Sequence, residues 1–178
     1  MPDMDHDLNA EPAAETPPPP HSTPRKMAAR RGLESQDDVP HHAVARTVPD
    51  RVAKALERAA ICARICDDNR AKDIVVLDLR QATPLLDFFV IATAATRRQA
   101  NSIAIEIDVE MKKIQEFKLG MEGTEEGSWI LIDYGDFVVH LFIPEARAYY
   151  GLEEIWGDAP RLDWRDPSQP LPPTRAVD

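Results

Sequence analysis

The stretch WILIDYGDFVVHLF, residues 129–142, brings together side chains that could carry out acid–base chemistry. Asp133 and Asp136 supply carboxylates, while Tyr134 and His140 supply groups that exchange protons. A histidine oriented by a carboxylate can act as a general base, and the same residue types bind metal ions. They are also common on surfaces that bind another macromolecule. The pattern therefore favours either a catalytic site or a docking surface.

A β-hairpin is expected to position these side chains. Gly135 and Asp136 lie between two β-rich runs, which predicts a two-residue turn with Tyr134 opposite Phe137. Because side chains alternate along a strand, this register puts Asp133 and His140 on one face as near diagonal neighbours, close enough to interact. That face also carries Trp129, Leu131, Val138 and Phe142, and the other face carries Ile130, Ile132, Tyr134, Phe137, Val139 and Leu141.

Several features disfavour catalysis by this stretch. No nucleophile, second carboxylate at catalytic spacing or glycine-rich phosphate loop accompanies it. Asp136 is explained by its turn, where aspartate is favoured for local hydrogen bonding, and a histidine beside an aspartate is more often a structural pair. We therefore expect no catalytic residue, no metal site and no cofactor.

The alternative is a nucleotidyltransferase-type enzyme acting with a divalent metal. Such enzymes place two aspartates, one residue apart, on a strand, and these hold the metal ions that bridge the transferred phosphoryl group. The candidate strands here contain VLDLR and LLDFFVI, so Asp78 and Asp87 each stand alone. One ligand per strand does not build a two-metal site.

Apolar periodicity predicts the elements that surround the hairpin. A helix is expected over 49–68, capped by Thr47, with Cys62 and Cys66 as buried, unreactive thiols on its apolar face. Strands are expected at 73–79 and 87–93, where the second is apolar throughout and so should be central.

A second long helix should begin with a capping box of Thr96 and Gln99 and run to about residue 118, where Gly120 can end it. After a polar turn segment (122–127) and the hairpin, residues 145–156 should form short helical pieces broken at Gly151. The predicted class is α/β, a compact sandwich of a mixed four- to five-stranded sheet with flanking helices.

Prolines and charge define the organisation of the 178-residue chain. Nine of the sixteen prolines lie in 1–49 and five in 160–178, which predicts a globular part over 50–160 between disordered tails at 1–49 and 161–178. The central part carries −7 of the net charge of −10, which disfavours direct nucleic-acid binding and suits a basic protein partner. No membrane span or secretory segment is evident, so a cytoplasmic protein is expected. A scaffold that works through its proline-rich tail is a less supported alternative.

Several segments resemble a known family. DYGDFVVHLFIPEARAYYGLEEIWGDAP (133–160), with LLDFFVIAT and TRRQA upstream, is similar to the ribosomal silencing factors, also called the Iojap-like family. The resemblance covers about residues 50–160. Ala94 and Ala95 stand where a glycine-containing turn is expected, and Ile143 replaces a polar residue before Pro144.

This resemblance implies a nucleotidyltransferase-like fold without its catalytic site, and hence a protein that is not an enzyme. It implies binding to the large ribosomal subunit through ribosomal protein fourteen of that subunit, on the face that meets the small subunit. Binding there blocks joining of the small subunit and represses translation when nutrients are limiting. Family members are also similar in forming homodimers when free.

We place the expected docking surface on the hairpin and the C-terminal helical pieces, because interfaces combine aromatic anchors with a polar rim. The opposing interpretation is that Trp129 and Trp156 belong to the core. The predicted partner-binding residues are Trp129, Leu131, Asp133, Tyr134, Asp136, His140, Phe142, Tyr149, Tyr150, Leu152 and Trp156.

Overall fold

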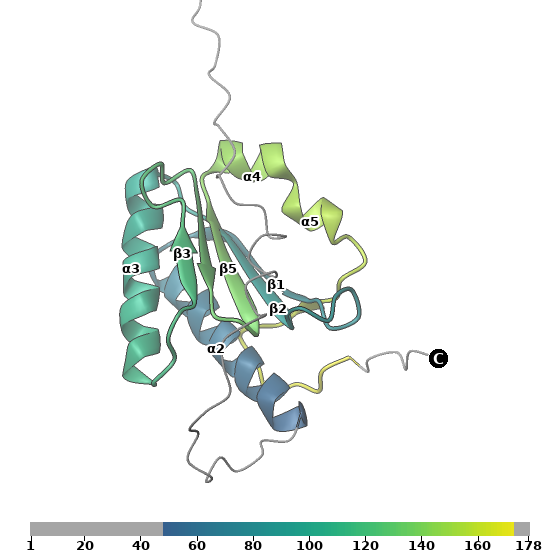
Figure 1. Ribbon diagram of the computed structural model, residues 1–178. Helices are drawn as coiled ribbons and strands as arrows, with labels where there is room; N and C mark the ends of the chain where they lie inside the picture. The colour runs from purple at the N-terminus through teal and green to yellow at the C-terminus, as the bar shows by residue number, and fades with distance from the viewer. Residues whose placement is uncertain (1–47, 173–178) are drawn as a thin grey trace, which may run out of the picture.

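The computed structural model of the protein describes residues 48–172. Most of the tail expected over 1–49, including the cap expected at Thr47, therefore lies outside the described residues. Within 48–172, no helix is long and apolar enough to cross a membrane. In chain order (Figure 1) the elements are α2 (Val48–Asp68), β1 (Lys72–Asp78), β2 (Phe88–Thr93), α3 (Arg97–Lys113), β3 (Gly120–Glu122), β4 (Trp129–Asp133), β5 (Phe137–Phe142), α4 (Pro144–Tyr150), α5 (Leu152–Ile155) and β6 (Arg161–Leu162).

The strands form one six-stranded sheet in the order β3-β4-β5-β2-β1-β6. The two central strands, β2 and β5, are parallel to each other, and every residue of both is buried. The other neighbouring pairs are antiparallel. Strands that are apolar along almost their whole length suit this position, because both faces of the sheet are covered. The predicted α/β class with a mixed sheet is confirmed.

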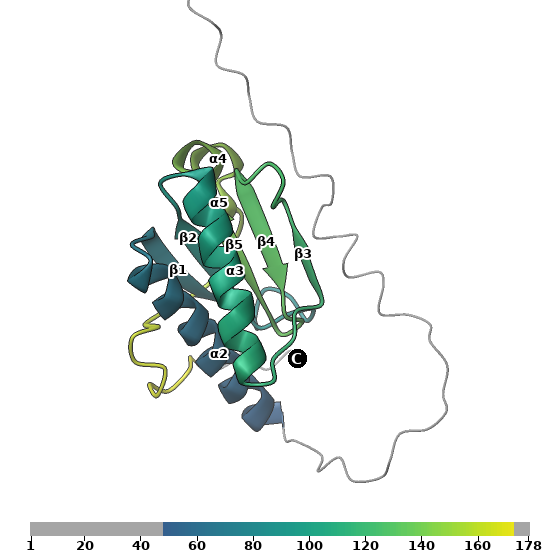
Figure 2. The ribbon, with the colours of Figure 1, turned by 90° about the vertical axis from the view of Figure 1, so that its left-hand side faces the viewer.

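Helices cover both faces of this sheet. α2 and α3 lie on one face, and α4 and α5 lie on the other (Figures 1 and 2). The α2–α3 side holds the larger apolar cluster, in which Ile103 and Ile107 of α3 pack with Ile130 of β4. The α4–α5 side holds a smaller cluster that includes Phe89 of β2 and Leu152 of α5. The two sides therefore differ in how much apolar surface the helices bury.

The first predicted helix is confirmed as α2. Its apolar residues recur at spacings of three and four, and this face is buried against the sheet. Cys62 and Cys66 are free and buried on that face. Burial raises the pKa of the Cys66 thiol to about 12, so it stays protonated and unreactive at neutral pH.

The second long helix, α3, begins as predicted but ends earlier. The Thr96 hydroxyl accepts a hydrogen bond from the Gln99 N–H (3.1 Å), and the Gln99 side chain accepts one from the Ala95 N–H (2.7 Å). The helix stops at Lys113 rather than near residue 118, because Gln115 adopts a left-handed conformation with φ of 60°. Gly120, expected to end the helix, instead begins β3.

The hairpin follows the predicted register. The Tyr134 N–H donates to the Phe137 carbonyl (3.0 Å), and the two rings stack with centroids 4.9 Å apart. Trp129 pairs with Phe142 and Asp133 with Val138 along the ladder. The apolar side chains of the two predicted faces lie in different clusters on opposite sides of the sheet.

The sheet has six strands, more than the predicted four or five, because it also contains the short strands β3 and β6. β3 has three residues and β6 has two, too few for a periodic pattern to show. β6 pairs with β1, and beyond it Trp164 is buried while Leu171 packs on the same cluster. Residues 161–172 therefore pack on the domain, beyond the boundary expected at residue 160.

Candidate protein-docking site

Aromatic rings from four elements form a continuous chain of contacts on the α4–α5 side of the sheet. Trp156 meets Phe89 edge-on at 5.9 Å between centroids, and Phe89 meets His140 edge-on at 4.6 Å. His140 lies 5.8 Å from Trp129, whose ring is 4.6 Å from Tyr150. Tyr149 closes the chain at 5.1 Å from Tyr150. Ring contacts of this kind hold large side chains in fixed positions.

Five side chains of this region reach the surface, and together they are called the docking face. Tyr149 and Ile155 are 62% and 70% exposed, although both are large and apolar or aromatic. Trp129, Tyr150 and Trp156 are half-buried, with part of each side chain packed on the smaller apolar cluster. Half-buried anchors beside exposed apolar groups are typical of surfaces that bind another protein. The docking face consists of Trp129, Tyr149, Tyr150, Ile155 and Trp156.

Ile155 was not among the predicted site residues. Its position beside Trp156 in the run LEEIW was the available signal, but a four-residue helix is too short for periodicity to show which side chain faces solvent. The structure resolves this because Leu152 points into the core and Ile155 points away from it.

Other predicted site residues are buried beneath this face. His140 and Phe142 have almost no exposed surface, and Leu131 and Leu152 have little. Tyr134 is buried on the opposite face of the sheet, against α2 and α3. The strand face expected to be open is therefore covered, because α4 and α5 fold back over it (Figure 1). Four of these residues pack beneath the docking face and support it, whereas Tyr134 belongs to the other side of the sheet.

His140 pairs with Trp129 and not with Asp133. The indole Nε1–H of Trp129 donates to His140 Nδ1 (3.2 Å), while the Asp133 carboxylate accepts from the Gly135 N–H (2.6 Å). Burial lowers the pKa of His140 to about 3, so the imidazole is neutral at physiological pH. The expected interaction between Asp133 and His140 is absent, and a buried neutral imidazole has no carboxylate to orient it as a base.

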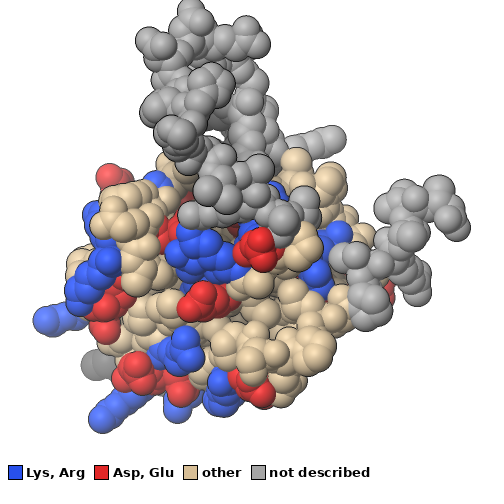
Figure 3. Space-filling view, turned by 90° about the horizontal axis from the view of Figure 1, so that it is seen from below, with Lys and Arg blue, Asp and Glu red and all other residues tan. Residues whose placement is uncertain are grey.

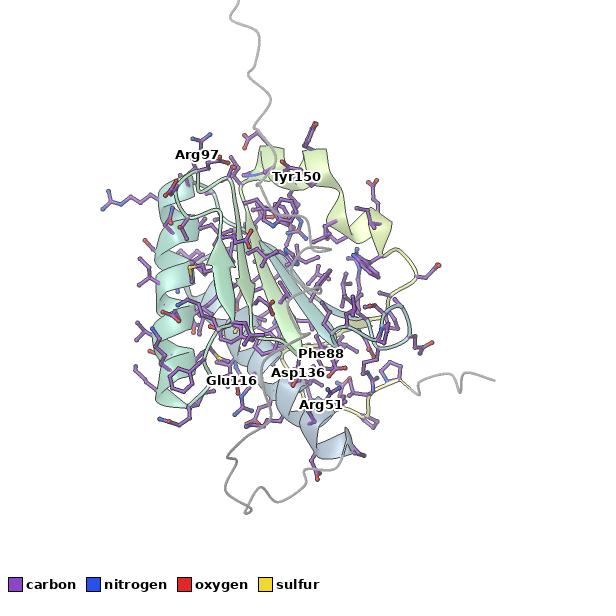
Figure 4. All side chains as sticks on the ribbon, in the orientation of Figure 1. Arg51, Phe88, Arg97, Glu116, Asp136 and Tyr150 are labelled. Carbon is purple, nitrogen blue, oxygen red and sulfur yellow. The ribbon has the colours of Figure 1, made fainter. Side chains whose placement is uncertain are left out.

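Asp136 lies at the other end of the sheet. Figure 4 shows it beside Arg51 and Phe88, far from Tyr150. Arg51 bridges two carboxylates, with Nη1 3.4 Å from Asp136 and Nη2 3.2 Å from Asp87. Acidic and basic side chains are interspersed over this end of the molecule (Figure 3). Asp136 thus belongs to a charge cluster that ties α2 to the sheet, separate from the docking face.

The two aspartates of the alternative enzyme hypothesis each form an ion pair with an arginine. Asp78 is buried and receives two hydrogen bonds from the Arg80 side chain, at 2.8 and 2.6 Å. Burial raises the pKa of Asp87, while Arg51 acts in the opposite direction. Within residues 48–172, no three His, Cys, Asp or Glu side chains are placed to hold a metal ion. Carboxylates engaged in this way are poor candidates for metal ligands.

The six-stranded mixed sheet with helices on both faces defines a mixed α/β domain, and solved structures share it. The crystal structure of a Chromobacterium violaceum protein, 35% identical, matches with a TM-score of 0.55 over 59% of this chain and 86% of that one. The model of the family described as "Ribosomal silencing factor during starvation" matches residues 52–177. The chain belongs to this family.

Two relatives illustrate the range of the family. The Bacillus subtilis ribosomal silencing factor RsfS is 44% identical over 105 residues, which cover 58% of this chain and 87% of the relative. The chloroplastic protein Iojap of Arabidopsis thaliana is 36% identical over 124 residues, covering 68% of this chain and 51% of that protein. The resemblance inferred from the sequence is therefore confirmed.

Proposed function

We propose that this protein binds the large ribosomal subunit through ribosomal protein fourteen of that subunit and blocks joining of the small subunit. Translation would thereby be repressed under nutrient limitation. Membership of the silencing-factor family supports the ribosomal target. The single structural observation that carries the proposal is the docking face, where Tyr149 and Ile155 are exposed beside a chain of aromatic rings.

The charge around the docking face supports a basic protein partner. The segment 144–160 contains four acidic residues and one arginine. Glu154 and Asp158 are exposed, and neither forms an ion pair with another residue of the described range. Aromatic anchors supply affinity at such an interface, while the acidic rim speeds encounter and selects a partner of opposite charge. Blocking subunit joining then needs only a folded body held at the subunit interface.

Co-sedimentation with purified large subunits tests the proposal, together with pull-down of isolated ribosomal protein fourteen. Ile155→Ser should weaken both interactions about tenfold, the scale of one interface hot spot. Leu85→Ser is the matched control, since Leu85 is similarly exposed (56%) but lies in the loop between β1 and β2 and is not part of the docking face. Equal binding by the two variants, or no binding by the unmodified chain, would contradict the proposal.

We further infer that the fold is nucleotidyltransferase-like and lacks a catalytic site. Its support is the engagement of Asp78 by Arg80 and of Asp87 by Arg51, which leaves neither carboxylate available to a metal ion. The protein then acts by binding and not by catalysis.

We also propose that the free protein forms a homodimer, as family resemblance implies. Exposed apolar side chains on and after α3, with the open sheet edge at β3, offer a surface with suitable composition. Sedimentation velocity at micromolar concentration should give the mass of two chains; the mass of one chain would contradict the proposal. The exposed apolar residues of this region are Ile105, Val109, Ile114, Phe117 and Leu119.

A further inference from the structure

The helices that carry most of the docking face are too short to be stable by themselves. α4 has seven residues and α5 has four, whereas isolated helices shorter than about twelve residues are marginal in water. Gly151 separates them in a left-handed conformation with φ of 51°, so their hydrogen bonds do not form one continuous helix. Contacts with the rest of the domain must therefore hold both helices in place.

Among residues 48–172, Arg147 of α4 forms side-chain hydrogen bonds that tie these helices to each other and to the sheet. Its Nε and Nη2 donate to the two carboxylate oxygens of Glu153 in α5, at 3.1 and 2.6 Å. Its Nη1 donates to the Thr93 hydroxyl at the end of β2 and to the Asp73 carbonyl at the start of β1, both at 2.7 Å. A single guanidinium thus joins α4, α5 and two strands.

The geometry at Arg147 depends on arginine in particular. A planar guanidinium can satisfy both oxygens of a carboxylate and still direct a further N–H elsewhere. Lysine carries the same charge but offers one nitrogen, so it cannot bridge Glu153 and the strand acceptors in the same way. The side chains of Arg147 and Glu153 are only 12% and 22% exposed, so solvent does little to replace these bonds.

We propose that Arg147 is a positioning residue for the docking face. Its guanidinium is engaged by contacts inside the domain. By fixing α5 to α4, and both helices to the sheet, it sets the position of Tyr149 on α4 relative to Ile155 at the end of α5 and Trp156 directly after it. This inference rests on the proposed function of the docking face, because positioning matters only for a surface that binds.

The physical basis is pre-organisation. An interface built from few anchors binds tightly only when those anchors are already held in the bound arrangement, since ordering them on binding costs free energy. Without the Arg147 bonds, the segment after Gly151 keeps Leu152 as its main buried anchor. The aromatic anchors would then sample several arrangements, and the affinity would fall although the domain stays folded.

The chain offers a closely matched control. Arg58 of α2 forms an ion pair with Glu116 after α3, and these side chains are 11% and 24% exposed. The two pairs carry the same charges and are similarly buried, but Arg58 lies on α2, on the opposite side of the sheet from α4 and α5. Figure 4 shows Glu116 and Tyr150 at opposite ends of the domain.

The test compares Arg147→Lys with Arg58→Lys in the full chain. Binding to purified large subunits is measured at a temperature where circular dichroism shows both variants to be fully folded. Arg147→Lys should weaken binding about tenfold, and Arg58→Lys should leave affinity within about twofold even if both lower Tm equally.

Hydrogen exchange separates failure of this inference from failure of the proposed function. Amide exchange in residues 145–156 should accelerate in Arg147→Lys and stay unchanged in Arg58→Lys, whether or not ribosomes are the partner. Exchange could accelerate in Arg147→Lys alone while the unmodified chain fails to bind ribosomes. That result would refute the proposed function and leave Arg147 as the residue that orders this surface. Equal exchange in the two variants, or equal affinity of Arg147→Lys and the unmodified chain, would overturn the role of Arg147.

Discussion

His140 shows how one buried side chain links the docking face to solution pH. The folded protein holds it neutral, because burial lowers its pKa from the ordinary value of 6.5 to about 3. The unfolded chain takes up a proton near pH 6.5, and the folded chain does not. The free energy of unfolding is therefore fully maintained above about pH 6.5 and declines as the pH falls toward 3.

This difference predicts a loss of about 1 kcal/mol of stability per pH unit between pH 6 and pH 4 from His140 alone. His140→Gln removes the titration but keeps an acceptor for the Trp129 indole N–H. Urea unfolding at several pH values should show the stability advantage of the unmodified protein shrinking as the solution is acidified. Titration of the carboxylates is common to both proteins and cancels in the comparison. Parallel pH profiles for the two proteins would therefore contradict the lowered pKa of His140.

Because Asp78 and Asp87 are each paired with an arginine, we expect the protein neither to bind nucleotides nor to turn them over. With magnesium and labelled nucleoside triphosphates, the protein should show neither binding nor turnover, since Asp78 and Asp87 are engaged by Arg80 and Arg51. Equilibrium dialysis and product analysis by thin-layer chromatography measure both. Turnover that disappears in Asp87→Asn would restore the enzyme interpretation and remove the non-catalytic one.

At the scale of elements, the segment after α5 is expected to stabilise the fold. Trp164 is buried in the larger cluster, and the Asp78 N–H donates to the Pro160 carbonyl (2.9 Å) beside β6. Arg80 also donates to the Pro172 carbonyl (3.0 Å). These contacts cover the β1 edge of the sheet, where an open strand would otherwise expose unpaired backbone groups.

Removing this segment should therefore be costly. Trp164→Ala is expected to lower the free energy of unfolding by about 3 kcal/mol, the scale of burying a large aromatic side chain. A chain shortened to 48–160 should lose at least as much, while 48–172 should match the full chain. Guanidinium unfolding of the three shortened or substituted proteins measures this. Equal stability of 48–160 and 48–172 would show that 50–160 is sufficient after all.

Elements with a strong period were predictable, and short ones were not. α2 and the β4–β5 hairpin follow from their apolar spacing, and the Gly135–Asp136 turn determines the register. β3 and β6 have too few residues for a period, and their pairing depends on partners far along the chain. The end of α3 was misplaced because a left-handed Gln115 has no signature in the sequence.

The same limit applies to the candidate site. Alternation identified which hairpin side chains share a face, but it could not show that α4 and α5 cover that face. Coverage follows from tertiary packing and from bonds such as Arg147 to Thr93, which join residues 54 positions apart. The sequence therefore predicted a region rich in aromatic side chains, and the structure was needed to separate its exposed side chains from its buried ones.

At the scale of the whole molecule, the net charge of −10 predicts electrostatic steering toward a basic partner. Association with large subunits should slow as salt rises from low to physiological concentration, and removal of Glu154 and Asp158 should reduce this dependence. Stopped-flow mixing of the Glu154→Gln/Asp158→Asn variant with large subunits measures how the association rate depends on salt. Glu57→Gln, an exposed site on α2, should behave as the unmodified chain. A rate independent of salt would contradict steering, although docking itself could persist.

Subunit joining tests the central claim most directly. Purified small and large subunits are mixed with increasing amounts of the protein, and joined ribosomes are followed by light scattering and sucrose-gradient profiles. The account predicts that joined ribosomes decline as the protein occupies the large subunit, and that Ile155→Ser requires a correspondingly higher concentration for the same decline. Undiminished joining while the protein remains bound to the large subunit would contradict the account.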